Sequence, residues 1–141
     1  MQAAEQARGT MPMWVAAEHL KGNAHILANQ TNETGKEFAT WFSVPELNHH
    51  LMEGLSFPKE MKKMLMFVLF DSDLYYKRNR VRMKLTKEVI EKNKVKTGVV
   101  KVVGKNKAEQ VFGMLAWGGY FSLYMAMLNE IDPSLIPWVD Y

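Results

Sequence analysis

Apolar and polar positions follow one another in a pattern that predicts strands alternating with helices. Short, almost continuous apolar runs at residues 11–17 and 63–70 predict strands that are buried on both faces. β-Branched and aromatic residues at 40–44 and 95–103 predict two further strands. Strands that alternate with helices are typical of a parallel α/β sheet. We therefore expect a three-layer αβα domain with a mainly parallel sheet of four to five strands.

Three helices are predicted between these strands from apolar positions spaced three or four residues apart. The first covers about residues 23–38, with Asn23 as its N-cap. The second covers 79–93, and its inward-facing residues are expected to be Val81, Leu85, Val89 and Ile90. The third covers 107–129 and contains the longest apolar run, residues 114–128. That run is shorter than the ~18 residues needed to cross a bilayer, so it predicts a buried helix.

This fold class directs the search for function to one edge of the sheet. Ligands of open α/β sheets bind beyond the carboxyl ends of the strands, which here are the loops after Ala17, Val44, Phe70 and Val103. The sequence contains no GxGxxG, GxxxxGK[ST] or GxSxG motif. The loops therefore do not predict a nucleotide cradle or a nucleophile elbow.

The length and composition indicate the number of domains, the kinds of site that are excluded and the cellular compartment. A chain of 141 residues corresponds to one domain. The absence of cysteine excludes a disulfide framework, a thiolate zinc site and a cysteine nucleophile, and it is consistent with a reducing compartment. The first twenty residues lack the pattern of a signal peptide. We expect a cytoplasmic protein without a membrane partner.

Neither the charge nor the histidines of the sequence predict a nucleic-acid partner or a metal site. The net charge of +3 is mild, and the basic cluster at residues 77–84 is interpreted as a solvated helix face, so no nucleic-acid partner is predicted. Of the four histidines, His49 and His50 are adjacent, and His19 and His25 lack the i, i+4 spacing of a helical ligand pair. No metal site is predicted.

The residues that point to catalysis lie between positions 29 and 57. Glu33 is expected on a helix, and His49 follows in a segment that opens with Pro45, where Asn48 is expected to cap a short turn. A carboxylate and an imidazole in one pocket can move protons between carbon and oxygen. The alternative interpretation is a solvated glutamate and a capping segment with exposed imidazoles.

Two separated motifs resemble one family. EHLKGNAHILANQTNETGK with PELNHHLMEG, and GYFSLYMAMLNEIDPSLIPWVDY at the end of the chain, closely resemble the C-terminal half of bifunctional phosphoglucose/phosphomannose isomerases of the sugar isomerase (SIS) superfamily. The likeness covers residues 11–141, so residues 1–10 are expected to be the remnant of an N-terminal helix. It implies the flavodoxin-like SIS fold and a short final helix.

The resemblance implies roles for individual residues. Glu33 of the Asn32-Glu33-x-x-Lys36 motif would be the base that moves a proton between C2 and C1 through a cis-enediol, with Asn32 and Lys36 beside the substrate. His49 would open the sugar ring, with Asn48 and His50 beside it, and His50 is the alternative for that role. It further implies a homodimer in which Glu33 of one chain faces the histidine of the other, and no cofactor.

The resemblance also implies a part that this sequence lacks. The family's first half provides a Ser/Thr-rich loop that holds the sugar phosphate, and no such cluster is present here. We therefore expect an isomerase domain for glucose 6-phosphate or mannose 6-phosphate and fructose 6-phosphate that is weak or inactive without that half. The alternative is a non-catalytic SIS module that binds sugar phosphates or forms dimers.

Overall fold

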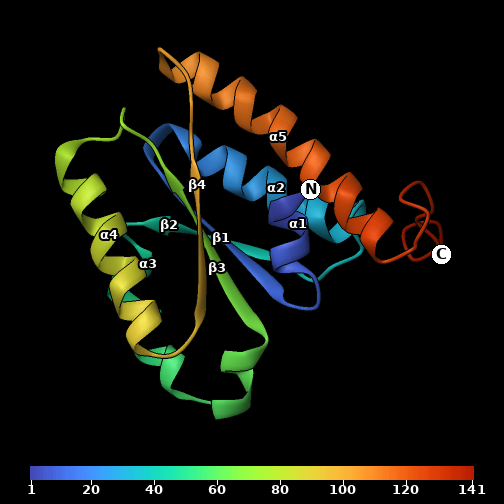
Figure 1. Cartoon of the computed structure of the whole chain (residues 1–141), viewed down its shortest axis with the longest axis horizontal. Helices are drawn as coiled ribbons and strands as arrows, with labels where there is room; N and C mark the ends of the chain where they lie inside the picture. The colour runs from blue at the N-terminus through green and yellow to red at the C-terminus, as the bar shows by residue number, and fades with distance from the viewer.

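Four strands form a single parallel sheet in the order β2-β1-β3-β4. The computed structural model describes all residues from 1 to 141 (Figure 1). The strands are β1 (Met11–Ala17), β2 (Thr40–Val44), β3 (Leu65–Asp71) and β4 (Lys96–Lys101). The central strands β1 and β3 are buried along nearly their whole length, as their continuous apolar runs predict. The predicted parallel sheet is confirmed, with β2 and β4 at its edges.

Helices cover both faces of this sheet (Figure 1). Helices α1, α2 and α5 form one outer layer, and α4, with the short α3 beside it, forms the other. Their bounds are α1 Gln2–Ala7, α2 Lys21–Glu33, α3 Leu47–His50, α4 Lys77–Lys92 and α5 Lys107–Leu128. Single 3₁₀ turns occupy Glu18–Leu20, Glu53–Ser56 and Lys59–Lys63. The result is the three-layer αβα architecture expected from the sequence.

Helix α2 differs from its predicted bounds at both ends. It begins at Lys21 rather than at Asn23, whose side chain is buried and donates a hydrogen bond to the carbonyl of Val111 on α5. It ends at Glu33 because Lys36 adopts a left-handed conformation with a φ of 53°. Tertiary contact with α5 thus replaces the expected N-cap.

The inward face of α4 also differs from the prediction. The exposed residues include Val81, Leu85 and Val89, whereas Ile90 is buried as predicted. The other buried residues are Met83 and Thr86. The helix therefore presents a second stripe, at i, i+3 and i+7, to the sheet. Of these, Thr86 is also held by α3, because its hydroxyl accepts a hydrogen bond from the side chain of Asn48 at 2.6 Å.

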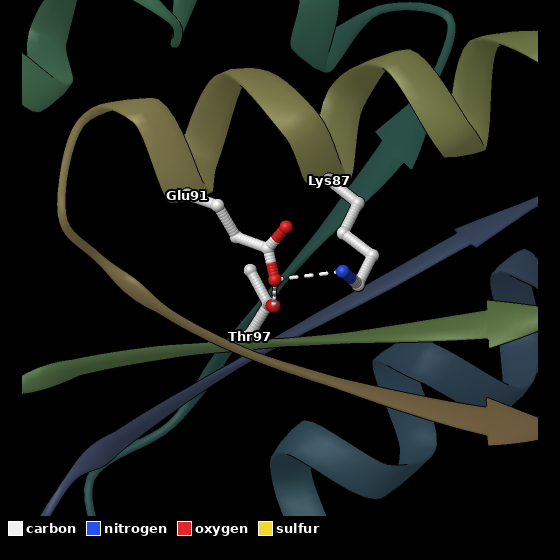
Figure 2. A network of polar contacts seen from close by, with 3 residues as sticks. All are labelled: Lys87, Glu91 and Thr97. Carbon is white, nitrogen blue, oxygen red and sulfur yellow. Dashed lines mark hydrogen bonds and ion pairs between the residues drawn. The ribbon is translucent and has the colours of Figure 1, made fainter.

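A carboxylate on α4 ties that helix to the edge strand β4. Figure 2 shows two bonds converging on one oxygen of Glu91, from Lys87 Nζ at 2.7 Å and from Thr97 Oγ1 at 2.6 Å. These two hydrogen bonds hold the pKa of the Glu91 carboxyl below its usual value. The network joins the last turns of α4 to the beginning of β4.

The core is centred on Trp14 of β1, which is completely buried. Its ring meets Phe121 of α5 edge-on, with centroids 4.8 Å apart, and Phe70 of β3 at 6.1 Å. These aromatic contacts join the sheet to the α5 layer.

Helix α5 buries only one face, contrary to the expectation of a buried helix. Its outward residues Phe112, Tyr120 and Met127 are each more than 60% exposed. The helix has 22 residues, so by length and composition alone it could cross a membrane, unlike the shorter apolar run considered above. Its other face packs on α2 and on the sheet, as in the core helix of a globular domain.

Candidate functional site

The predicted base lies at the amino edge of the sheet, not at the carboxyl edge where ligands were expected. Helix α2 leaves the carboxyl end of β1 and runs back across the sheet, so its last residue, Glu33, lies close to the start of β2. Helix α5 runs the same way and delivers the C-terminal segment, residues 129–141, to the same edge (Figure 1). This segment forms turns rather than the expected short final helix.

The end of α2 and the C-terminal segment enclose an open groove of about 720 Å³. Its polar wall consists of Asn29, Asn32, Glu33 and Lys36. Its opposite wall, mainly apolar, consists of Ile131, Asp132, Leu135, Ile136, Pro137, Trp138 and Val139. The sequence analysis identified Asn32, Glu33 and Lys36 of the polar wall, and it missed Asn29 and the whole of the second wall. The signal for the second wall was the terminal motif itself, but no local pattern places it against α2.

Asn32 fixes the polar wall to the strand that follows. Its Nδ2 donates hydrogen bonds to the carbonyls of Ala28 and Ala39, at 2.7 and 2.8 Å. Its Oδ1 accepts one from the backbone N–H of Ala39, at 3.1 Å. Both amide hydrogens are thus engaged by backbone, and the adjacent Glu33 is left exposed toward the groove.

Charged groups line the groove next to Glu33. Lys36 donates a hydrogen bond from Nζ to the backbone carbonyl of Glu33, in the manner of a basic side chain at a helix C-terminus. Asp132 accepts hydrogen bonds from the hydroxyl and the N–H of Ser134, which hold the pKa of the Asp132 carboxyl below its usual value. Lys36 lowers this pKa further by charge. Asp132 is therefore ionised at neutral pH.

The two candidate histidines lie at the other end of β2. Helix α3 follows this strand directly, and both His49 and His50 are exposed on it. The residue at the N-cap is Glu46, so the expected capping role of Asn48 is wrong: Asn48 lies inside the turn and donates to Thr86 instead. His50 lines a smaller groove with Trp41, Phe42, Ser43, Glu46 and Leu47.

A single chain therefore does not bring Glu33 and His49 together. The structure groups Asn32 and Lys36 with Glu33, and it groups Asn48 and His50 with His49. Between the two groups runs β2, whose five residues span about 17 Å at ~3.3 Å each.

At the carboxyl edge, where this fold class binds ligands, side chains of the chain itself meet between the ends of β1 and β3. Beside them, at the ends of β3 and β4, lies a pocket of about 660 Å³ lined by Asp71, Asp73, Arg80, Lys101, Val102, Val103, Gly104, Lys105 and Glu109. Completely buried Gln110 of α5 accepts a hydrogen bond from Ser72 Oγ at 2.6 Å and donates to Asp73 Oδ1 at 3.0 Å. His19 Nε2 lies 2.9 Å from Gln110 Oε1. Sequence analysis missed this network, because its members come from loops and a helix that are distant in the sequence.

Tyr75 is buried at the same edge of the sheet, next to the end of β1. Its hydroxyl accepts a hydrogen bond from the backbone N–H of Ala17, at 3.2 Å. Burial raises the pKa of the Tyr75 hydroxyl well above its usual value, and the nearby carboxylates of Glu18 and Asp71 add to this effect. No group of three or more His, Asp or Glu side chains is arranged to hold a metal ion.

Comparison with known proteins identifies the family. The model for the bacterial phospho-glucose isomerase C-terminal SIS domain matches residues 1–141. A bifunctional phosphoglucose/phosphomannose isomerase from Caldicellulosiruptor bescii is 31% identical over 128 residues, which cover 89% of this chain and 35% of that protein. A protein of the same description from Aquifex aeolicus is 26% identical over 120 residues, or 83% of this chain and 37% of that protein.

Solved structures agree on the fold. A glucose-6-phosphate isomerase like protein from Thermus thermophilus has a TM-score of 0.79 at 17% identity and covers 98% of this chain, which spans 46% of that one. Glucosamine-6-phosphate deaminase from Thermotoga maritima has a TM-score of 0.63 at 15% identity, over 96% of this chain and 42% of that one.

The chain spans about a third of the length of the curated relatives that it matches. The family expected from the two sequence motifs is confirmed, since the family model matches the whole chain. This chain belongs to the C-terminal SIS domain family of bacterial phosphoglucose isomerases.

Proposed function

We propose that this chain supplies the proton-transfer groups of an aldose–ketose isomerase that converts glucose 6-phosphate or mannose 6-phosphate to fructose 6-phosphate. The observation that supports this most directly is the position of Glu33, an exposed carboxylate in a groove with one polar and one mainly apolar wall. Such a groove can hold a sugar between hydrogen-bonding groups and apolar side chains.

Glu33 acts as the base in this proposal. Its carboxylate takes the proton from C2 of the open-chain aldose, and the electron pair of that bond forms the double bond of a cis-enediol while O1 gains a proton. Glu33 returns its proton to C1 as the hydrogen on O2 is lost, which gives the ketose. The histidine imidazole is the second proton-carrying group in this proposal: it gives the proton that O1 gains and takes the proton that O2 loses, so that no other donor or acceptor is needed.

His49 opens the sugar ring by donating a proton to the ring oxygen. Because β2 separates it from Glu33 within one chain, His49 acts in the groove of a partner subunit, and the working unit is a homodimer. His50 is the alternative donor. Lys36 contacts the substrate, while Asn32 serves chiefly to position Glu33, since its amide is bonded to Ala28 and Ala39.

The Ser/Thr-rich loop expected to hold the phosphate group is absent from this chain. Gln110, Ser72 and Tyr75 lie between the ends of β1 and β3, where they are hydrogen-bonded to one another or to the backbone. Binding energy from a remote phosphate is what an isomerase of this kind uses to position the reacting carbons. We therefore propose that the isolated chain turns over slowly, and that a second SIS half completes the enzyme.

Deuterium exchange from solvent into the sugar tests the role of Glu33, because it detects slow proton transfer without requiring release of product. At high protein concentration we expect deuterium to enter glucose 6-phosphate at C2, and mass spectrometry measures how much is incorporated. Glu33→Gln is expected to reduce the rate by about 100-fold or more. The matched control is Glu60→Gln, a change at an exposed residue that does not line the groove, and it should leave the rate unchanged. Equal rates in wild type and Glu33→Gln would contradict the proposal.

Two observations favour a second candidate function. Glu33 and His49 are separated in the single chain, and no phosphate loop is present, so the domain can be a non-catalytic module that binds sugar phosphates or forms dimers. Calorimetric binding of glucose 6-phosphate with no exchange at C2 in the wild type would support this module instead of the isomerase.

A further inference from the structure

The pocket at the ends of β3 and β4 carries charged side chains that the proposed isomerase does not use. It has a volume of about 660 Å³ and is lined by the loops that follow both strands. Open α/β sheets bind their ligands at this carboxyl edge. We propose that this β3–β4 pocket binds a small phosphorylated polyol, whose phosphate is held by Arg80, Lys101 and Lys105.

Three cations from three different elements line the pocket without a charged partner in the protein. Arg80 belongs to α4, Lys101 ends β4 and Lys105 lies in the loop before α5. None of them forms an ion pair, since the one ion pair of the chain joins Lys87 to Glu91. Their charged groups are therefore available to an anion. Such side chains bind phosphate through charge-assisted hydrogen bonds, and a guanidinium can donate two at once.

Two of the three carboxylates in the pocket are already engaged by uncharged donors of the protein. Glu109 accepts hydrogen bonds from the backbone N–H of Lys105 and from Asn106 Nδ2, both at 2.8 Å. Asp73 Oδ1 accepts a hydrogen bond from Gln110 at 3.0 Å. These carboxylates hold the loops that surround the pocket, and they leave the three cations unpaired.

The third carboxylate, Asp71, gives the pocket an acceptor for hydroxyl groups. It is exposed at the end of β3 and takes part in no ion pair. A bare phosphate ion would only be repelled by this carboxylate, whereas a polyol phosphate can donate hydroxyl hydrogens to it while its phosphate meets the cations. A metal ion is not favoured, because the acidic side chains form no group of three that could hold one. The mixture of charges therefore favours a phosphorylated polyol.

The loop between β4 and α5 holds its shape without a ligand. The N–H of Val102 donates to the carbonyl of Asp71 at 2.8 Å, which continues the contact between the two strands. A Cβ at Gly104 would lie 2.8 Å from the backbone nitrogen of Gln110, so the glycine allows the loop to lie against the first turn of α5. The wall of the pocket is thus formed in advance, which reduces the cost of binding.

The β3–β4 pocket is separate from the groove at Glu33. Helix α5 begins beside the pocket and ends beside the groove (Figure 1). Its 22 residues span about 33 Å at 1.5 Å each, so one small ligand cannot occupy both sites. The inference therefore does not rest on the proposed function.

Amide NMR of the full 141-residue chain, titrated with sorbitol 6-phosphate, locates the binding site. This polyol phosphate has no carbonyl group, so it is not isomerised and the measurement does not depend on activity. We expect saturable shifts in residues 71–73 and 101–105, and no shifts there with sorbitol, which lacks the phosphate. Shifts confined to residues 29–36 and 131–139, around the groove, would overturn the proposal.

Removal of single cations tests which side chains hold the phosphate. Arg80→Gln and Lys101→Gln should each raise the Kd by about tenfold or more, because each removes a charge-assisted hydrogen bond. The matched control is Arg82→Gln, which removes the same charge from an exposed residue of α4 that does not line the pocket. It should raise the Kd by less than about twofold, because exposed charges outside a site are screened. Equal weakening by Arg80→Gln and Arg82→Gln would overturn the proposal.

Two further probes test the kind of ligand. Inorganic phosphate should bind more weakly than sorbitol 6-phosphate, and Asp71→Ala should reduce this difference because it removes the hydroxyl acceptor. A difference that Asp71→Ala leaves unchanged would overturn the polyol part of the proposal. Single-stranded polyuridylate is not expected to displace sorbitol 6-phosphate. If it binds more tightly and shifts amides along the whole of α4, the cations serve a nucleic acid and the proposal is overturned.

Failure of this inference is distinct from failure of the proposed function. Exchange at C2 in the wild type, with no shifts in residues 101–105, would retain the isomerase and discard the pocket. Shifts in residues 101–105 that Arg80→Gln weakens, with no exchange at C2, would retain the pocket and discard the isomerase.

Discussion

Asn32 binds both main-chain groups of Ala39, donating to its carbonyl at 2.8 Å and accepting from its N–H at 3.1 Å. This two-way contact joins the last turn of α2 to the residue just before β2. It sets where Glu33 lies relative to the start of the strand. The Asn–Glu pair in the sequence is therefore one structural device, in which one residue holds the backbone and the next presents its carboxylate.

Replacing Asn32 should damage both stability and catalysis. Asn32→Ala removes three hydrogen bonds and leaves the N–H of buried Ala39 without its acceptor, so we expect a loss of about 1–3 kcal/mol in the free energy of unfolding. Urea denaturation measures this loss. Asn32→Asp keeps the acceptor for the N–H of Ala39 but turns a carboxylate oxygen toward the carbonyls of Ala28 and Ala39, so at neutral pH it should lose at least as much. Equal stability of Asn32→Ala and wild type would show that the contact does not hold the loop.

Two glycines should respond to alanine in opposite ways. A Cβ at Gly35 would lie 2.8 Å from the backbone carbonyl oxygen of Thr31, so Gly35→Ala forces the backbone to move and should cost about 1–3 kcal/mol. A Cβ at Gly119 of α5 meets nothing within 4 Å, so Gly119→Ala should stabilise the helix by about 0.5–1 kcal/mol. Thermal unfolding of both variants checks the signs, and destabilisation by Gly119→Ala would contradict the reasoning.

Tyr75 should make the fold sensitive to alkali. Burial raises the pKa of its hydroxyl in the folded state, so its contribution to stability is present below the unfolded pKa of about 10 and is lost as the pH rises above it. We expect the free energy of unfolding of the wild type to fall more steeply above about pH 10 than that of Tyr75→Phe. At pH 7 the variant should be less stable by about 1–3 kcal/mol, because the buried N–H of Ala17 loses its acceptor. Parallel pH profiles for the two proteins would refute this account.

Gln110 should contribute strongly to the stability of the fold through its hydrogen bonds at the carboxyl edge of the sheet. Gln110→Leu has a similar volume but leaves buried Ser72 without its acceptor and Asp73 without its donor, so we expect a loss of about 2 kcal/mol or more in urea denaturation. The double variant Ser72→Ala, Gln110→Leu removes both members of one bond. It should recover part of that loss, and a simple sum of the single effects would show that the two side chains act independently.

The strands and the family were accessible from the sequence because their signals are local. Strands β1 and β2 have the predicted bounds, since a continuous apolar run or a β-branched and aromatic stretch decides its own conformation. The motif Asn32-Glu33-x-x-Lys36 is likewise a contiguous stretch, so the family could be identified from its order of residues. The site assignments built on that motif remain predictions that the exchange experiment tests.

Tertiary structure alone decided what each element faces. On helix α4 the face at Met83, Thr86 and Ile90 packs inward, and the predicted residues Val81 and Leu85 are left exposed. The groove at Glu33 has a wall from residues 131–139, about a hundred positions away. A linear pattern records which side chains share a helix face or a strand face. It does not record which distant segment will cover that face, because that choice depends on packing and hydrogen bonds formed only when the whole chain has folded.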